Sequence, residues 1–178
     1  MIQEIYQKAM RFAGEANSTK IVPGTKANYL LHISNVVMEV IMAHKFADTF
    51  DIGLAVQMAI LHDSIEDTDL TYQDIANEFG SPVADGVMAL TKDDSLATKA
   101  DKMRDSLDRI KSCKYVECSI VKLADRITNL QEPPAFWDSK KRAKYHKEAQ
   151  LINNELAGSN SYLNDRLNDK IIQYKKWL

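Results

Sequence analysis

The chain is poor in glycine, proline and cysteine, and each shortage narrows the possible folds. Its 178 residues include 6 glycines and 4 prolines, which favours helices over a fold of short strands and tight turns. The 2 cysteines, Cys113 and Cys118, are five positions apart and suggest neither a metal ligand set nor a secreted disulfide framework. We interpret them as free thiols in a reducing cytoplasm.

An excess of one charge and long apolar runs are also missing. The formal net charge is −2, so the chain lacks the basic surface that is typical of nucleic-acid-binding proteins. No apolar run approaches the roughly 18 residues of a membrane span, and the N-terminus lacks a signal peptide. We therefore expect a cytoplasmic protein that binds neither nucleic acid nor membrane. The length suits a single domain over residues 1–178.

Apolar residues recur at helical spacing along nearly the whole chain, which predicts an all-α bundle. Residues 54–62 are nearly all apolar and are expected to form a central helix. Thr71 is a predicted N-cap, and Ser81 is expected to cap the next helix with Pro82 at its first position. The other helices are expected at about residues 2–16, 28–43, 98–111, 117–130, 140–156 and 162–177.

The most unusual segment is residues 61–69, Leu-His-Asp-Ser-Ile-Glu-Asp-Thr-Asp. It contains the adjacent pair His62 and Asp63, and it places four carboxylates within seven residues. These carboxylates repel one another at neutral pH, and a bound cation removes the conflict because imidazole nitrogens and carboxylate oxygens are ligands for divalent metals. Two neighbouring residues cannot complete a coordination shell, so further ligands must come from elsewhere in the chain.

Two distant residues are candidates for the remaining ligands. His32 lies in a mostly apolar predicted helix, and Asp125 lies within an apolar helical stretch, where a carboxylate is costly to bury unless it is paired or metal-bound. Alternatively, His32 is a hydrogen-bonded core histidine, and Asp125 pairs with Lys122 or Arg126 on the helix surface. His146 lies among charged residues and is interpreted as solvent-exposed.

The order of one His, then His-Asp, then a distant Asp resembles the HD superfamily of metal-dependent phosphohydrolases. Residues 62–69 are similar to the HD-x-x-ED-T motif of the hydrolase domain of RelA/SpoT proteins and of stand-alone small alarmone hydrolases. Residues 79–92 resemble the next helix and loop of that family, and residues 122–130 resemble its K-L-A-D-R-x-x-N-L block. The resemblance extends from about Tyr6 to Glu155 and predicts a compact HD-domain helical bundle.

The resemblance implies an enzyme that removes the 3′-pyrophosphate of guanosine tetra- and pentaphosphate with one Mn²⁺ ion. It implies four metal ligands, which are His32, His62, Asp63 and Asp125. Fe²⁺, Co²⁺ or Zn²⁺ would also suit these ligands. Glu66 and Asp67 match the catalytic acidic pair of the family, which orients water and handles protons. Alternatively, these two acids interact with the dipole of the helix that starts at Thr71.

The residues that match substrate contacts of the family agree with its pattern less well than the metal ligands do. The predicted contacts are Lys20, Lys26, Tyr29, Lys99, Asn129 and Tyr145. The loop at residues 17–33 departs from the family, because its arginines and its His-Pro pair are absent. Lys20 and Lys26 replace some of that charge, although lysine lacks the planar fork of arginine. The helix at residues 99–111, with Lys99, Lys102 and Arg104, is either a phosphate-binding wall or a solvated charged face.

The leading hypothesis is an alarmone hydrolase that acts on a small-molecule nucleotide. The changed loop motivates an alternative, a phosphatase of the same fold that acts on a deoxynucleoside monophosphate or NADPH. A second alternative is a non-catalytic nucleotide-sensing module. The presence of the four ligands and both acids in the sequence disfavours this last hypothesis.

Overall fold

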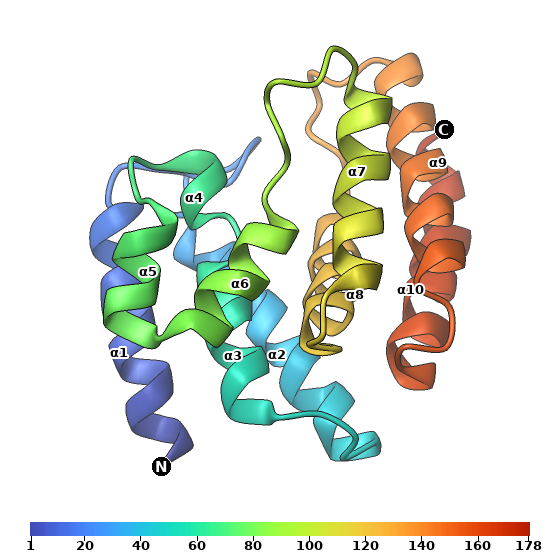
Figure 1. Cartoon of the computed structure of the whole chain (residues 1–178). Helices are drawn as coiled ribbons and strands as arrows, with labels where there is room; N and C mark the ends of the chain where they lie inside the picture. Colours follow the sequence, from blue (N-terminus) through green and yellow to red (C-terminus); the bar gives the residue numbers. More distant parts are fainter.

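The computed structural model describes residues 1–178 and contains helices, loops and one isolated β-bridge between Ile21 and Asn28 (Figure 1). This confirms the all-α fold class. The helices are α1 Ile2–Ala16, α2 Leu30–Phe46, α3 Ile52–Leu61, α4 Ser64–Asp67, α5 Tyr72–Phe79, α6 Ser81–Leu90, α7 Lys99–Ser112, α8 Glu117–Asn129, α9 Ser139–Glu155 and α10 Ser161–Tyr174, followed by the 3₁₀ helix η1 Lys175–Trp177. None of them has the length and apolar composition that crossing a membrane requires.

The helix ends follow local capping chemistry, with one error in the sequence interpretation. The hydroxyl of Thr71 accepts a hydrogen bond from the backbone N–H of Asp74, and the Asp74 carboxylate accepts one from the Thr71 backbone, so the predicted cap forms a capping box. The prediction that Ser81 caps α6 was wrong, because Ser81 is already helical and Gly80 is the N-cap. Gly80 has a φ of 88°, a conformation that glycine adopts without steric cost.

Helix α8 is the buried centre of the bundle. It contacts α2, α3, α6, α7, α9 and α10, and every residue from Glu117 to Thr128 is buried. A helix that is buried all round is normally apolar, yet α8 carries Lys122, Asp125 and Arg126. Asp125 does pair with Lys122, at 3.9 Å, but the expected location on a helix surface was wrong, because all three side chains are buried.

The arrangement of the helices brings distant segments to one place. Helices α1 and α5 lie on one side of the molecule, α9 and α10 lie on the other, and α2, α3, α6 and α8 lie between them (Figure 1). Within this centre, α2 packs against α3 and α8, and α3 also packs against α8. His32 lies in the first turn of α2, His62 directly follows α3, and Asp125 lies in the last part of α8.

His146 was predicted to be exposed, and this was wrong. Its side chain is 7% exposed, and its Nε2 atom lies 3.1 Å from the carbonyl oxygen of Ile171 in α10. The charged neighbours of His146 in the sequence lie on other faces of α9, while His146 itself points toward α10. Its function is structural, because it joins the two C-terminal helices.

Gly86 marks the closest approach of α6 to α3. A Cβ atom there would lie 2.1 Å from Cε and 2.5 Å from Sδ of Met58, whose side chain is fully buried. We expect Gly86→Ala to lower the free energy of unfolding by about 1–3 kcal/mol, because overpacking outweighs a helix-propensity gain of up to about 1 kcal/mol. Denaturant unfolding of the purified variant measures this change.

The matched control is Gly14→Ala in α1. A Cβ atom at this position meets only the Leu30 side chain, at 3.5 Å, which is ordinary contact. This variant should therefore gain up to about 1 kcal/mol from helix propensity alone. An unfolding free energy for Gly86→Ala that equals or exceeds the wild-type value would contradict the tight packing between α6 and α3.

Candidate metal centre

Two buried imidazoles face each other where α2 and α3 meet. The Nε2 atoms of His32 and His62 are 3.3 Å apart, and the two side chains are 6% and 4% exposed. The Nδ1 atom of His62 lies 2.8 Å from the carbonyl oxygen of Ala59, so Nδ1–H donates to that oxygen. In the neutral imidazole this donation leaves the Nε2 lone pair directed toward His32, which is the tautomer that a metal ligand needs.

Two carboxylates approach the same point from different elements. The Nε2 atom of His62 lies 3.1 Å from Oδ2 of Asp63, and the Nε2 atom of His32 lies 3.4 Å from Oδ1 of Asp125. One possible ligand atom from each of His32, His62 and Asp63 lies within 4.8 Å of the other two, and Asp125 adjoins both imidazoles. This donor set of nitrogen and oxygen atoms can hold a divalent cation.

The charges of these residues are strongly coupled. Burial acts to lower the pKa of His62, but Asp63 and Asp125 outweigh burial and raise the pKa to about 9. Burial acts to raise the pKa of both carboxyl groups, but His62 lowers the pKa of Asp63, and His32 and Lys122 lower that of Asp125. Both carboxylates are therefore ionised at neutral pH, which suits them to binding a cation.

Two of the predicted substrate contacts, Tyr29 and Asn129, also contact the carboxylates of the centre. The hydroxyl of Tyr29 donates a hydrogen bond to Oδ2 of Asp63, and the side-chain amide of Asn129 donates one to Oδ1 of Asp125. Burial and the charge of Asp63 raise the pKa of Tyr29 well above its usual range, so the hydroxyl keeps its proton. These hydrogen bonds orient the two carboxylates toward the imidazoles.

The acidic pair of Glu66 and Asp67 lies on α4, a four-residue helix that the sequence pattern did not predict. The ammonium group of Lys92 lies 2.6 Å from Oε1 of Glu66, and the backbone N–H of Lys92 donates to Oε2 at 3.2 Å. Burial acts to lower the pKa of Lys92, but Glu66 outweighs it and raises the pKa, so the ammonium group keeps its charge. Asp67 accepts a hydrogen bond from Lys20, whose ammonium group also lies 3.3 Å from the centre of the Tyr29 ring.

A cleft with a volume of about 390 Å³ opens beside these residues. Six carboxylates line it, which are Asp63, Glu66, Asp67, Asp94, Asp125 and Glu148. Five basic side chains line it as well, which are Lys92, Lys99, Lys102, Lys122 and Arg126. Asn129 and Tyr145 line it as well, and the ring of Tyr145 stacks against the Arg126 guanidinium at 4.4 Å. Lys26 and Arg104 are exposed and lie outside this lining.

Some of these residues were missed by the sequence interpretation. Lys122 and Arg126 lie in the same apolar stretch that singled out Asp125, so the same pattern indicates three buried charges rather than one. Lys92 had no comparable signal, because its contact with Glu66 depends on how the loop after α6 lies against α4.

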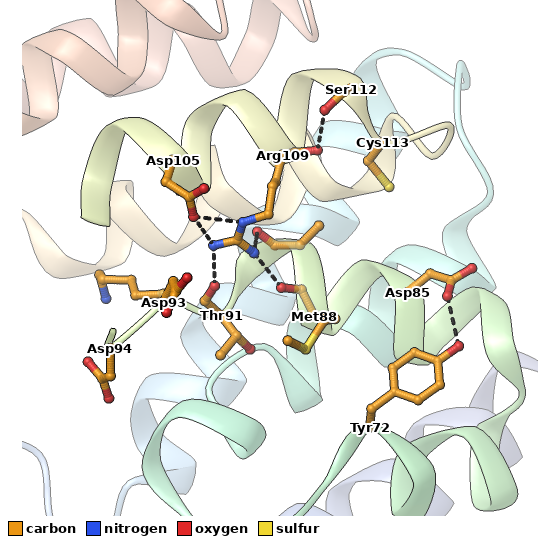
Figure 2. A pocket seen from close by; sticks show the side chains of 12 residues that line it. Tyr72, Asp85, Met88, Thr91, Asp93, Asp94, Asp105, Arg109, Ser112 and Cys113 are labelled. Carbon is orange, nitrogen blue, oxygen red and sulfur yellow. Dashed lines mark hydrogen bonds and ion pairs between the residues drawn. The ribbon is translucent and has the colours of Figure 1, made fainter. Parts of the chain in front are cut away.

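A second groove explains how the segment around Lys92 is held. This groove has a volume of about 610 Å³ and lies between α6 and α7 (Figure 2). Within it, Arg109 pairs with Asp105 at 2.8 Å and donates to the carbonyl oxygens of Met88 and Thr91, each at 2.7 Å. These bonds satisfy carbonyl groups at the C-terminal end of α6, which have no partner within the helix. They anchor α7 directly beside Lys92.

The sequence of this chain is similar to those of several known hydrolases. The chain is 31% identical over 122 residues to guanosine-3′,5′-bis(diphosphate) 3′-pyrophosphohydrolase MESH1 of Danio rerio, with 66% of this chain and 67% of that protein aligned. The alignment with the Xenopus tropicalis MESH1 covers 63% of that protein. The corresponding enzyme of Aquifex aeolicus is 30% identical over 155 residues, which are 86% of this chain and 21% of that protein.

A solved structure of a metazoan ortholog of SpoT that hydrolyses ppGpp has the same fold, with a TM-score of 0.81 and 24% identity over 95% of this chain and 94% of that one. The structure of lmo0812 from Listeria monocytogenes aligns with a TM-score of 0.65 over 84% of this chain and 99% of that one. A match to the HD domain covers residues 9–160. The chain therefore belongs to the HD domain family.

Proposed function

We propose that this protein is a metal-dependent hydrolase that removes the 3′-diphosphate of guanosine 3′,5′-bis(diphosphate), ppGpp, and releases GDP and pyrophosphate. The observation that carries the proposal is the convergence of His32, His62, Asp63 and Asp125 beside an acidic pair in a cleft lined by cations. Relatives that are named as ppGpp hydrolases support the choice of substrate.

We assign one divalent ion to the four residues of the centre, and we propose that it is Mn²⁺. The facing Nε2 atoms and the ionised carboxylates support the fit of an ion, while Fe²⁺, Co²⁺ and Zn²⁺ match the same donors. When bound, the ion lowers the pKa of a water molecule and offsets charge on phosphoryl oxygens.

Glu66 and Asp67 are the proposed acid–base groups. Both line the cleft next to Asp63, so they can orient a water molecule and move its proton. Lys92 contacts both oxygens of Glu66 and limits the directions in which this carboxylate can turn. The alternative for these two acids is an interaction with the dipole of α5. Another acid, Asp74, already stabilises the start of that helix by completing its capping box.

The phosphate groups of the substrate are proposed to bind basic side chains that line the cleft. Lys99 and Lys102 reach it from α7, and Arg126 reaches it from α8. Lys102 pairs with Asp94 at 2.7 Å, but the Asp94 side chain is 85% exposed, so this ion pair is weak and a phosphate can replace it. Asn129 and Tyr145, which line the same cleft, and Lys20, which contacts Asp67, are proposed nucleotide contacts.

A second candidate is hydrolysis of another nucleotide, such as a deoxynucleoside monophosphate or NADPH. The loop between α1 and α2 favours this candidate because it contains no arginine, and its Lys26 is exposed and lies outside the cleft lining. Either activity fits a cytoplasmic protein with a small-molecule substrate.

Incubating the protein with Mn²⁺ and ppGpp should release pyrophosphate and GDP. We expect Glu66→Gln to retain the metal and to lower kcat on the order of 10²–10⁴-fold, because it removes a proton-transfer group. His62→Ala should lose both metal and turnover. Asp69→Asn is the matched control, since Asp69 is an exposed acid of the same segment that does not line the cleft, and it should leave kcat unchanged. Turnover of another nucleotide without pyrophosphate release from ppGpp would refute the proposed substrate.

Tyr29→Phe should weaken metal binding while it keeps the aromatic ring under Lys20. The variant removes only the hydroxyl that orients Asp63, and loss of such a partner typically costs about 10–100-fold in metal affinity or activity. Competition with a metal chelator measures the affinity. Tyr72→Phe is the matched control, because it removes a hydrogen bond of 2.9 Å to Asp85 outside the cleft. Equal metal affinities of Tyr29→Phe and wild type would contradict the orienting function of Tyr29.

A further inference from the structure

The two cysteines lie at the connection between α7 and α8 and take no part in the cleft. Cys113 is the C-cap of α7, Cys118 lies in the first turn of α8, and their Sγ atoms are 3.2 Å apart as free thiols. A disulfide has an S–S distance of about 2.05 Å, so the sulfurs need to approach by only about 1.2 Å to form one. No other pair of thiols exists in the chain.

The two thiols differ in their access to solvent. Cys113 is partly exposed and lines both the groove between α6 and α7 (Figure 2) and a second hollow of about 370 Å³ near the start of α8. Cys118 is 0% exposed, and its sulfur also lies 4.0 Å from the carbonyl oxygen of Gly86. Burial and the neighbouring Cys113 raise the pKa of Cys118 above its usual range. A dissolved oxidant therefore reaches Cys113 and not Cys118.

We propose that Cys113 and Cys118 are an oxidation site, at which a peroxide oxidises Cys113 and Cys118 then closes an intramolecular disulfide. In the first step the Cys113 sulfur attacks hydrogen peroxide, an S–O bond forms, the O–O bond breaks, and one water leaves. In the second step the Cys118 sulfur attacks the sulfenic sulfur, the S–S bond forms, and the S–O bond breaks. The proton of the Cys118 thiol leaves with that oxygen as a second water. Two thiols and one peroxide thus give one disulfide and two waters.

The position of the pair gives the disulfide a structural consequence. Lys99 and Lys102 lie near the start of α7, and Asp125 and Asn129 lie near the end of α8, so these two helices form walls of the cleft. The cysteines lie at the other ends of the same helices. A disulfide therefore fixes the junction of the two walls without touching any side chain that lines the cleft. This inference does not depend on the proposed hydrolase activity.

Treating the native protein with hydrogen peroxide and measuring its intact mass tests the proposal. The monomer should lose about 2 Da, both thiols should become inaccessible to alkylation after unfolding, and dithiothreitol should reverse both changes. A mass gain of one or more oxygens at Cys113, with Cys118 still alkylated, would overturn the proposal. Disulfide-linked dimers as the main product would also overturn it.

Two variants separate the assigned functions of the thiols. Cys118→Ala should accumulate a Cys113 sulfenic acid that dimedone traps, because the resolving thiol is gone. Cys113→Ser should show no oxidation of Cys118 under native conditions, and peroxide oxidation of its Cys118 at the wild-type rate of thiol loss would overturn the assignment of Cys113. Thermal unfolding of both variants checks that they fold, and the wild-type mass measurement remains decisive if either does not.

Discussion

The rest of the structure depends on one constraint, which is that Asp125 of α8 is ionised and buried within the bundle. A carboxylate without partners in this setting is costly, because the apolar interior does not replace its hydration. His32 from α2, and Lys122 and Asn129 from α8 itself, supply the compensating contacts. These contacts require the first turn of α2 to lie against the last part of α8. His62, at the end of α3, must fit into the remaining space.

The acidic pair depends on a second, more distant set of contacts. Arg109 on α7 binds carbonyl oxygens at the end of α6, including that of Thr91. The next residue is Lys92, which contacts both oxygens of Glu66. A surface groove that contains no proposed catalytic group therefore helps to determine where a proposed catalytic carboxylate points. The arginine is held in turn by Asp105, one helical turn away on α7.

The sequence allowed the helical fold and the four candidate ligands to be predicted, because both follow from patterns within single helices or from a motif. The bundle class follows from apolar periodicity, and His62 and Asp63 stand out through charge crowding alone. Contacts between elements could not be predicted this way. The hydrogen bond of Tyr29 to Asp63 had no signal in the sequence, and His146 was expected at the surface but joins α9 to α10. α4 has too few residues to show a helical period.

The loop between α1 and α2, which is proposed to affect substrate choice, also contacts the candidate metal centre and the acidic pair. The backbone N–H of Tyr29 donates to the carbonyl oxygen of Lys20 at 2.9 Å, so the two residues are held together across the loop. Their side chains then diverge, with the Tyr29 hydroxyl on Asp63 and the Lys20 ammonium on Asp67. If the loop served only to select the substrate, its residues could be substituted without an effect on Asp63 or Asp67. Here Tyr29 and Lys20 are constrained, because a substitution at either position would remove a hydrogen bond to Asp63 or Asp67.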